Sequence, residues 1–184
     1  MSEEDILDYS VELMKYQIGQ VQLIDHELIE KILQNFRISA TSLNKYLRCK
    51  LTFYFESILR VPMARSASMG FGNAIHHALE QYFRDLERSV PRSKAGVNKL
   101  LELYQQGLDM FRSHFTAKEY ENYSKYGTTI LTEYYENYHT EWLTPRKYEL
   151  EYNIPITEYK GVPISGKLDR LNIYDGYITV TDYK

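Results

Sequence analysis

The stretch that decides the fold is Ser165-Gly-Lys-Leu-Asp-Arg-Leu-Asn-Ile-Tyr-Asp-Gly-Tyr-Ile-Thr-Val-Thr-Asp-Tyr-Lys184. Asp175-Gly176 lies between alternating apolar residues and predicts a hairpin, because a type I′ turn needs positive φ at both central positions. A two-residue loop at this point pairs residues whose numbers sum to 351. This register places Asp169 directly opposite Asp182, on the same face as an apolar cluster.

The opposed carboxylates point to metal chemistry. Cross-strand partners have Cβ atoms roughly 4.5–5.5 Å apart, so two like charges there repel unless a cation lies between them. Lys184 follows Asp182 by two residues and therefore projects from the same face, about 7 Å further along the strand. A metal-bound carboxylate pair beside a lysine is equipped to hydrolyse phosphodiesters. A solvent-facing hairpin tip with scattered charges is the alternative. We favour a site because the charged residues fall on the same strand face as the apolar residues and not on the polar face.

Three ordered elements resemble one family. They are Gly166-x-x-Asp169-Arg170 with Asp182-Tyr183-Lys184 after it, the upstream Gly72-Asn-Ala-Ile-His76, and the opening stretch from Ser39 to Phe55. The chain resembles the PD-(D/E)XK nuclease superfamily over roughly residues 38–184, in particular the RecB/AddB-type nuclease domains attached to DNA-repair helicases. This resemblance implies an α/β fold with a restriction-endonuclease-like core, in which a helix-rich N-terminal part precedes a small mixed sheet.

The resemblance also implies a site and a function. Mg²⁺ or Mn²⁺ is expected to be held by His76, Asp169, Asp182 and the carbonyl group of Tyr183, while Lys184 positions the attacking water. The expected activity is that of a metal-dependent DNA nuclease, and we favour an exonuclease. This nuclease is expected to leave a 5′-phosphate on its product and to work with a helicase in DNA repair or recombination.

Several assignments stay open at this stage. His77 follows His76 directly, so the doublet leaves the choice of ligand unsettled. Glu151 is a possible additional ligand, because the resembling domains often carry an acid on this strand, although we favour a solvent-facing Glu151. Four basic residues are candidate DNA contacts, and an ordinary solvated face explains the first three of them equally well. They are Lys45, Arg48, Lys50 and Arg170.

Apolar periodicity outlines the organisation of the chain. Residues 1–37 are expected to form a helical junction or linker segment with two helices around Gly19, and residues 38–184 the nuclease-like domain. The expected helices cover about 41–60, 69–88, 97–115 and 118–142, and the expected strands about 148–156 and 162–173. The tyrosines of the last helix could stack on single-stranded DNA, but we favour helix packing for them.

Composition limits the class of protein. The 184 residues carry a formal net charge of −3, and no apolar run approaches the length of about 18 residues that spans a bilayer. The acidic N-terminus lacks the pattern of a secretory signal, so we expect a cytoplasmic protein that contacts no membrane. The single cysteine, Cys49, permits no internal disulfide and cannot by itself hold an iron–sulfur cluster, so we expect no cluster in this chain and interpret Cys49 as a buried structural thiol.

The sequence stops at Lys184, whereas the resembling domains continue into a helix with a Gln-x-x-x-Tyr motif and further strands. We therefore expect the core to be truncated at its C-terminal end. A non-catalytic DNA-binding or helicase-docking module that retains the nuclease fold is the alternative function.

Overall fold

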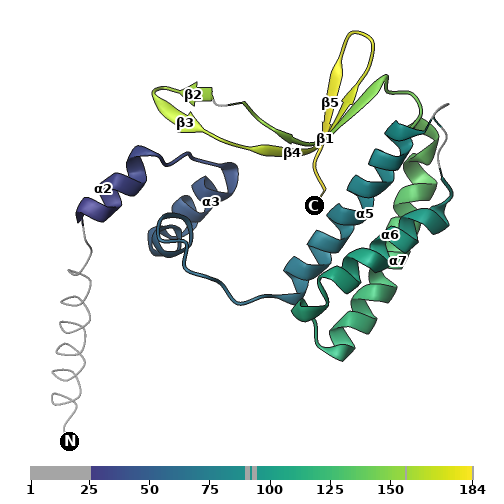
Figure 1. Ribbon diagram of the computed structural model, residues 1–184, viewed down its shortest axis with the longest axis horizontal. Coiled ribbons are helices and arrows are strands. Elements are labelled where there is room, and N and C mark those ends of the chain that lie inside the picture. The colour runs from purple at the N-terminus through teal and green to yellow at the C-terminus, as the bar shows by residue number, and fades with distance from the viewer. Residues whose placement is uncertain (1–25, 90–91, 93–94, 156, 184) are drawn as a thin grey trace, which may run out of the picture. The chain divides into compact units, whose positions relative to one another are not determined.

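The computed structural model describes residues 26–89, 92, 95–155 and 157–183. The chain divides into two compact units, residues 1–61 and residues 62–184. The expected helices before residue 26 and the side chain of Lys184 lie outside the described residues. Figure 1 shows the elements of both units.

The first unit contains short helices in place of the long one expected over 41–60. Its elements are α2 (His26–Gln34), α3 (Ala40–Arg48), α4 (Lys50–Phe53) and a π-helical turn, η2 (Tyr54–Ile58). The break falls at Cys49, whose backbone is extended with φ −158° and ψ 112°. Cys49 is therefore displaced from the helical stripe, and it is free and exposed. The expectation of a buried thiol is wrong for this reason.

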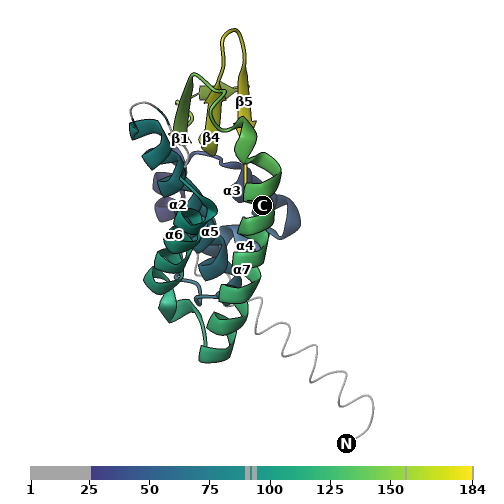
Figure 2. The same cartoon turned by 90° about the vertical axis from the view of Figure 1, so that its right-hand side faces the viewer.

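The second unit begins with three helices that lie side by side in Figures 1 and 2. They are α5 (Ala67–Arg88), α6 (Val97–Met110) and α7 (Ala117–Tyr138). Helices α6 and α7 end earlier than expected because the chain tightens into the 3₁₀ turns η3 (Arg112–His114) and η4 (His139–Glu141). Gly107 allows α6 to lie against α5, since a Cβ there would stand 2.9 Å from the carbonyl oxygen of Ala74.

The core of this unit is rich in aromatic residues. Phe83 of α5 is fully buried and its ring contacts those of Trp142 and Tyr148 at centroid distances of 5.1 and 5.0 Å. Tyr134 of α7 packs on Trp142 as well, at 5.7 Å. Most tyrosines of α7 thus take part in packing, as favoured from the sequence, while Tyr126 and Tyr138 remain about half exposed.

Five strands follow the helices. They are β1 (Lys147–Asn153), β2 (Thr157–Tyr159), β3 (Val162–Ile164), β4 (Lys167–Ile173) and β5 (Ile178–Thr181). Strands β1, β4 and β5 form an antiparallel sheet in the order β1-β4-β5, seen at one end of the helices in Figure 2, and β2 pairs with β3 as a separate hairpin. The strand expected over 162–173 is interrupted at Gly166, where a Cβ would stand 2.7 Å from the Cδ1 atom of Ile154.

The hairpin register agrees with the prediction. Leu171 pairs with Val180 and Ile173 pairs with Ile178, as a sum of 351 requires. The turn itself differs, because of its two central residues only Gly176 has a positive φ, 99°. The tight loop therefore sets the register without the type I′ geometry.

In the structure, the helices precede a small sheet along the chain, as the sequence predicts. The α/β fold class is confirmed. All strand pairings among the described residues are antiparallel. Across the described part of the chain, no helix combines the length and apolarity that crossing a membrane requires.

Candidate metal centre

Helix α5 carries the histidine of the site. The helix begins at Ser66, whose hydroxyl accepts a hydrogen bond from the amide of Met69 (3.2 Å), and its buried stripe includes Ala78 and Phe83. His76 borders that stripe and keeps 36% of its side chain exposed. The neighbouring His77 belongs to no group of close potential ligands among the described residues. The geometry thus favours His76 over His77 as the ligand.

Three potential ligands converge from three elements. One ligand atom each of His76 on α5, Glu151 on β1 and Asp169 on β4 lies within 4.8 Å of the other two. One imidazole nitrogen and two carboxylate oxygens form a donor set that suits a divalent cation such as Mn²⁺ or Mg²⁺. All three side chains are partly buried, which lowers the competition from water for the cation.

The backbone of Tyr183 orients two of these ligands. Its amide donates to Asp169 Oδ2 at 2.7 Å, and its carbonyl oxygen lies 3.2 Å from His76 Nε2. A carbonyl can only accept, so Nε2 carries the proton and Nδ1 of the neutral ring is left with a lone pair. Nδ1 faces Asp169 Oδ1 at 3.4 Å. Two acceptors in this position need a proton or a cation between them.

Glu151 occupies a strained position. Its φ is +54°, in the left-handed region that glutamate rarely adopts. Leu150 pairs with Arg170 and Tyr152 with Leu168, so Glu151 stands across from Asp169. The Glu151 side chain is 21% exposed and forms an ion pair with Lys167. Strained residues of this kind concentrate at functional sites, where the surrounding structure holds them in place.

Comparison with known proteins agrees with this geometry. The family model of the PD-(D/E)XK nuclease superfamily matches residues 37–184. The chain belongs to the PD-(D/E)XK nuclease superfamily. No curated protein and no solved structure gave a significant match. Membership suggests a nuclease fold with hydrolase activity on nucleic acid, and superfamily members generally use divalent metals.

The motif residues of the superfamily are not all in the cluster. Strand β5 ends at Thr181, and Asp182 is exposed and outside the group of three. Asp182 instead lines a cavity of about 440 Å³ together with His76 and Tyr183. A second cavity, of about 410 Å³, reaches His76 along His77 and Glu151. Lys184 follows Tyr183 directly, but its side chain is outside the described residues.

The structure changes the interpretation of Glu151. The alternation along β1 was taken to direct Glu151 to solvent, whereas the structure brings it to Asp169. The reason is that the β1–β4 register sets the two acids opposite each other, on a face where Asp169 also contacts His76 of α5. The odd-numbered acids on two neighbouring strands were the signal that could have found this pair.

The candidate DNA contacts separate into two groups. Lys45, Arg48 and Lys50 lie on α3 and α4 of the first unit, where Lys45 pairs with Glu56 at 2.9 Å. Arg170 is only 5% exposed. It is therefore buried in the second unit and does not lie on an open surface for a DNA backbone.

Proposed function

We propose that this protein is a metal-dependent deoxyribonuclease that hydrolyses phosphodiester bonds. The observation that carries the proposal is the cluster of His76, Glu151 and Asp169, held by the backbone of Tyr183 directly before Lys184, in a member of a nuclease superfamily. The two facing acceptors, His76 Nδ1 and Asp169 Oδ1, fit a divalent cation because a cation satisfies both at once. A cation held there would polarise a phosphoryl oxygen and stabilise negative charge on it.

The protein residues have distinct roles in this proposal. Asp169 is the central ligand, and its orientation depends on the amide of Tyr183. His76 supplies Nδ1 because its Nε2 proton is engaged by the carbonyl of Tyr183. Lys184 holds the attacking water, and Asp182 remains a proposed further ligand. The Tyr183 carbonyl, expected as a ligand from the family resemblance, instead faces His76 Nε2 and would have to leave it to reach a cation at Nδ1. Water adds to phosphorus, the P–O3′ bond breaks, and the products are a 5′-phosphate and a 3′-hydroxyl.

We further propose a RecB/AddB-type exonuclease that acts with a helicase in DNA repair or recombination in the cytoplasm. The order of Gly72, His76, Asp169 and Asp182 along the chain supports this subfamily. An exonuclease should degrade linear DNA and leave covalently closed circular DNA intact. Co-purification with an ATP-dependent helicase tests the proposed partner.

The main test compares Asp169→Asn with Asp175→Asn. Both changes remove one carboxylate charge from the same hairpin, but the side chain of Asp175 is 90% exposed at the turn. Mutation of residues that hydrogen-bond to metal ligands typically lowers activity about 10–100-fold, so loss of a ligand itself should reduce cleavage by about 100-fold or more. Cleavage of labelled DNA is followed with Mg²⁺, with Mn²⁺ and with EDTA. Equal cleavage by the two variants would reject the assignment.

A non-catalytic DNA-binding or helicase-docking module is the second candidate. The observation in its favour is that Ile178 and Val180 on β5 are 60% and 56% exposed, which leaves apolar surface for a partner. Calorimetric titration with Mn²⁺ separates the two functions. A docking module has no need of a site that takes up the metal and loses it in Asp169→Asn.

A further inference from the structure

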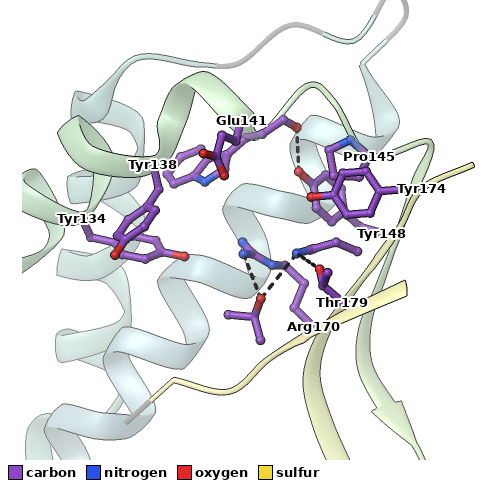
Figure 3. A pocket seen from close by; sticks show the side chains of 11 residues that line it. Tyr134, Tyr138, Glu141, Pro145, Tyr148, Arg170, Tyr174 and Thr179 are labelled. Carbon is purple, nitrogen blue, oxygen red and sulfur yellow. Dashed lines mark hydrogen bonds between the residues drawn. The ribbon is translucent and has the colours of Figure 1, made fainter. Parts of the chain in front are cut away.

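A cavity of about 500 Å³ lies between the end of α7 and the β1-β4-β5 sheet (Figure 3). Its walls include Tyr134, Tyr138 and Tyr174, with Glu141 at its edge. None of His76, Glu151 and Asp169 lines it. The cavity is therefore a separate feature from the candidate metal centre, and its volume is within the range of about 300–1,000 Å³ that is usual for small-molecule sites.

Arg170 brings a buried positive charge to this cavity. Only 5% of the residue is exposed, and no carboxylate of the described residues forms an ion pair with it. Its Nη2 donates to the hydroxyl of Thr181 at 3.3 Å, while Nε and Nη1 have no hydrogen-bond partner in the described part of the chain. A buried charge without an acceptor is costly, so the arrangement calls for an anionic group.

Aromatic rings only partly compensate this charge. The guanidinium carbon lies 4.0 Å from the ring centroid of Phe83 and 5.6 Å from that of Tyr183. These rings attract the cation through their faces but accept no conventional hydrogen bond from its N–H groups. Figure 3 shows the guanidinium of Arg170 in the middle of the labelled side chains. The unpaired N–H groups of the guanidinium suit a carboxylate or a phosphate, because two oxygens of either group can accept two of these N–H groups at once.

Two further polar side chains of the cavity offer acceptors, those of Asn172 and Glu141. Asn172 is 8% exposed, and its amide nitrogen donates to the hydroxyl of Thr179 at 3.0 Å. Its Oδ1 atom has no partner among the described residues. Together with the carboxylate of Glu141, it offers acceptors for the amino group of a ligand. An anion alone would leave these acceptors unused.

The tyrosine walls favour a planar ligand. The rings of Tyr134 and Tyr138 lie 5.1 Å apart, both residues line the cavity, and Tyr138 is 50% exposed. Bases stack on such rings for about 1–3 kcal/mol each. A nucleotide combines the three matching features: a phosphate, a planar base and an amino group on that base.

We propose that this cavity binds a phosphate-bearing nucleotide, with the phosphate on Arg170, the base against the tyrosines, and the base amino group on Asn172 and Glu141. The nucleotide is either free or the end of a DNA strand, since both present the same groups. This site goes beyond the proposed nuclease activity, because its ligand groups do not include those of the metal centre.

The test measures binding in EDTA, so that its result is independent of metal and of cleavage. The probe is the 5′-monophosphate of deoxyadenosine, followed by equilibrium dialysis, with deoxyadenosine and inorganic phosphate as separate probes. We expect the monophosphate to bind about tenfold more tightly than either part, because charge-assisted hydrogen bonds and base stacking each contribute about that factor. Failure of the wild-type protein to bind it at millimolar concentration, or equal affinity for inorganic phosphate, overturns the proposal.

Variants assign the groups. Arg170→Met replaces the buried charge by an apolar side chain of similar length, which is often tolerated, and should weaken binding about tenfold or more. Arg146→Met is the matched control, because the side chain of Arg146 is 78% exposed, and it should bind as wild type. Tyr138→Ala should weaken binding severalfold. This variant tests nucleotide binding in the cavity if Arg170→Met does not fold. Wild-type affinity in every folded variant contradicts the proposal.

One competition experiment distinguishes the two sources of the nucleotide. A short single strand with a 5′-phosphate is added to the protein loaded with labelled monophosphate, and the same strand with a 5′-hydroxyl serves as control. Displacement by the phosphorylated strand alone supports a strand end as the ligand. No displacement by either strand supports a free nucleotide.

Discussion

Glu151 is expected to be held at the metal centre at the expense of stability, and the change Glu151→Gly tests this. The left-handed φ of +54° costs a non-glycine residue about 1–2 kcal/mol. Glycine removes that strain, but its flexible unfolded state costs about 0.5–1 kcal/mol. The net gain from the backbone alone is therefore about 0.5–1 kcal/mol.

Electrostatics adds two opposing contributions. The ion pair with Lys167 is lost, but the Lys167 side chain is 54% exposed, so the loss is at most about 1 kcal/mol. The repulsion between Glu151 and Asp169, whose ligand atoms lie within 4.8 Å, disappears and returns about 1 kcal/mol at the dielectric constant of water. The metal-free variant should thus be about 1 kcal/mol more stable than wild type, which is about 4 °C in melting temperature.

The matched control is Lys160→Gly. Lys160 has nearly the same backbone angle, φ +52°, but it lies in the exposed turn between β2 and β3. Both variants gain from backbone relief, and only Glu151→Gly removes a ligand. Mn²⁺ at about 100 times its dissociation constant should stabilise wild type and Lys160→Gly by about 2.7 kcal/mol. It should stabilise Glu151→Gly much less.

Thermal unfolding of the three proteins, with EDTA and with Mn²⁺, measures both effects. If Glu151→Gly is less stable than wild type in EDTA while Lys160→Gly is more stable, the backbone of Glu151 is not held at a cost in stability. If Mn²⁺ protects Glu151→Gly as strongly as wild type, Glu151 is not a ligand.

The remaining predictions concern the helices and buried tyrosines. Gly127→Ala should destabilise the protein by about 1–3 kcal/mol or more in urea unfolding, because the new Cβ would overlap the hydroxyl group of Tyr104. Gly72→Ala meets nothing within 4 Å and should stabilise by about 1 kcal/mol, as expected inside a helix. Ser66→Ala removes the N-cap of α5 and should cost about 1 kcal/mol. Burial raises the pKa of four tyrosine hydroxyls, those of Tyr82, Tyr104, Tyr148 and Tyr183. Because an unfolded tyrosine ionises near about pH 10 while these stay protonated in the folded state, this contribution to stability is complete below about pH 10 and falls above it, by up to about 1.4 kcal/mol per pH unit for each tyrosine. Urea unfolding between pH 9 and pH 11 checks the sign.

Local signals were sufficient for the helix of His76 and for the C-terminal hairpin. The apolar stripe of α5 follows the helical period, and a two-residue loop leaves the pairing of β4 and β5 little freedom. Local signals did not fix the pairing of β1 with β4, because the connection between these strands contains the separate β2–β3 hairpin. No local feature of that connection sets the β1–β4 register, and so the sequence left Glu151 as a possible ligand only, with a solvent-facing position favoured.

Burial was the second point that required the fold. Arg170 follows Asp169 in the sequence and was named there as a candidate DNA contact. Adjacent residues of a strand point to opposite faces, and the face of Arg170 is covered by Phe83 and Tyr148. Only the packing of the helices on the sheet decides that Arg170 is buried.

By itself, the sequence determined the superfamily, the helix that carries His76 and the hairpin that carries Asp169. The helix and the hairpin follow from periodicity, turn residues and spacing, which act over a few residues, whereas the superfamily follows from the resemblance of the motifs and the match of the family model. The tertiary structure decided that Glu151 joins the cluster, that the Asp182 carboxylate lies outside it, and that Arg170 faces a cavity. Distances between ligands from different strands depend on register, on the backbone angles of single residues such as Glu151 and on the end of strand β5 at Thr181. These features arise only when distant segments pack together.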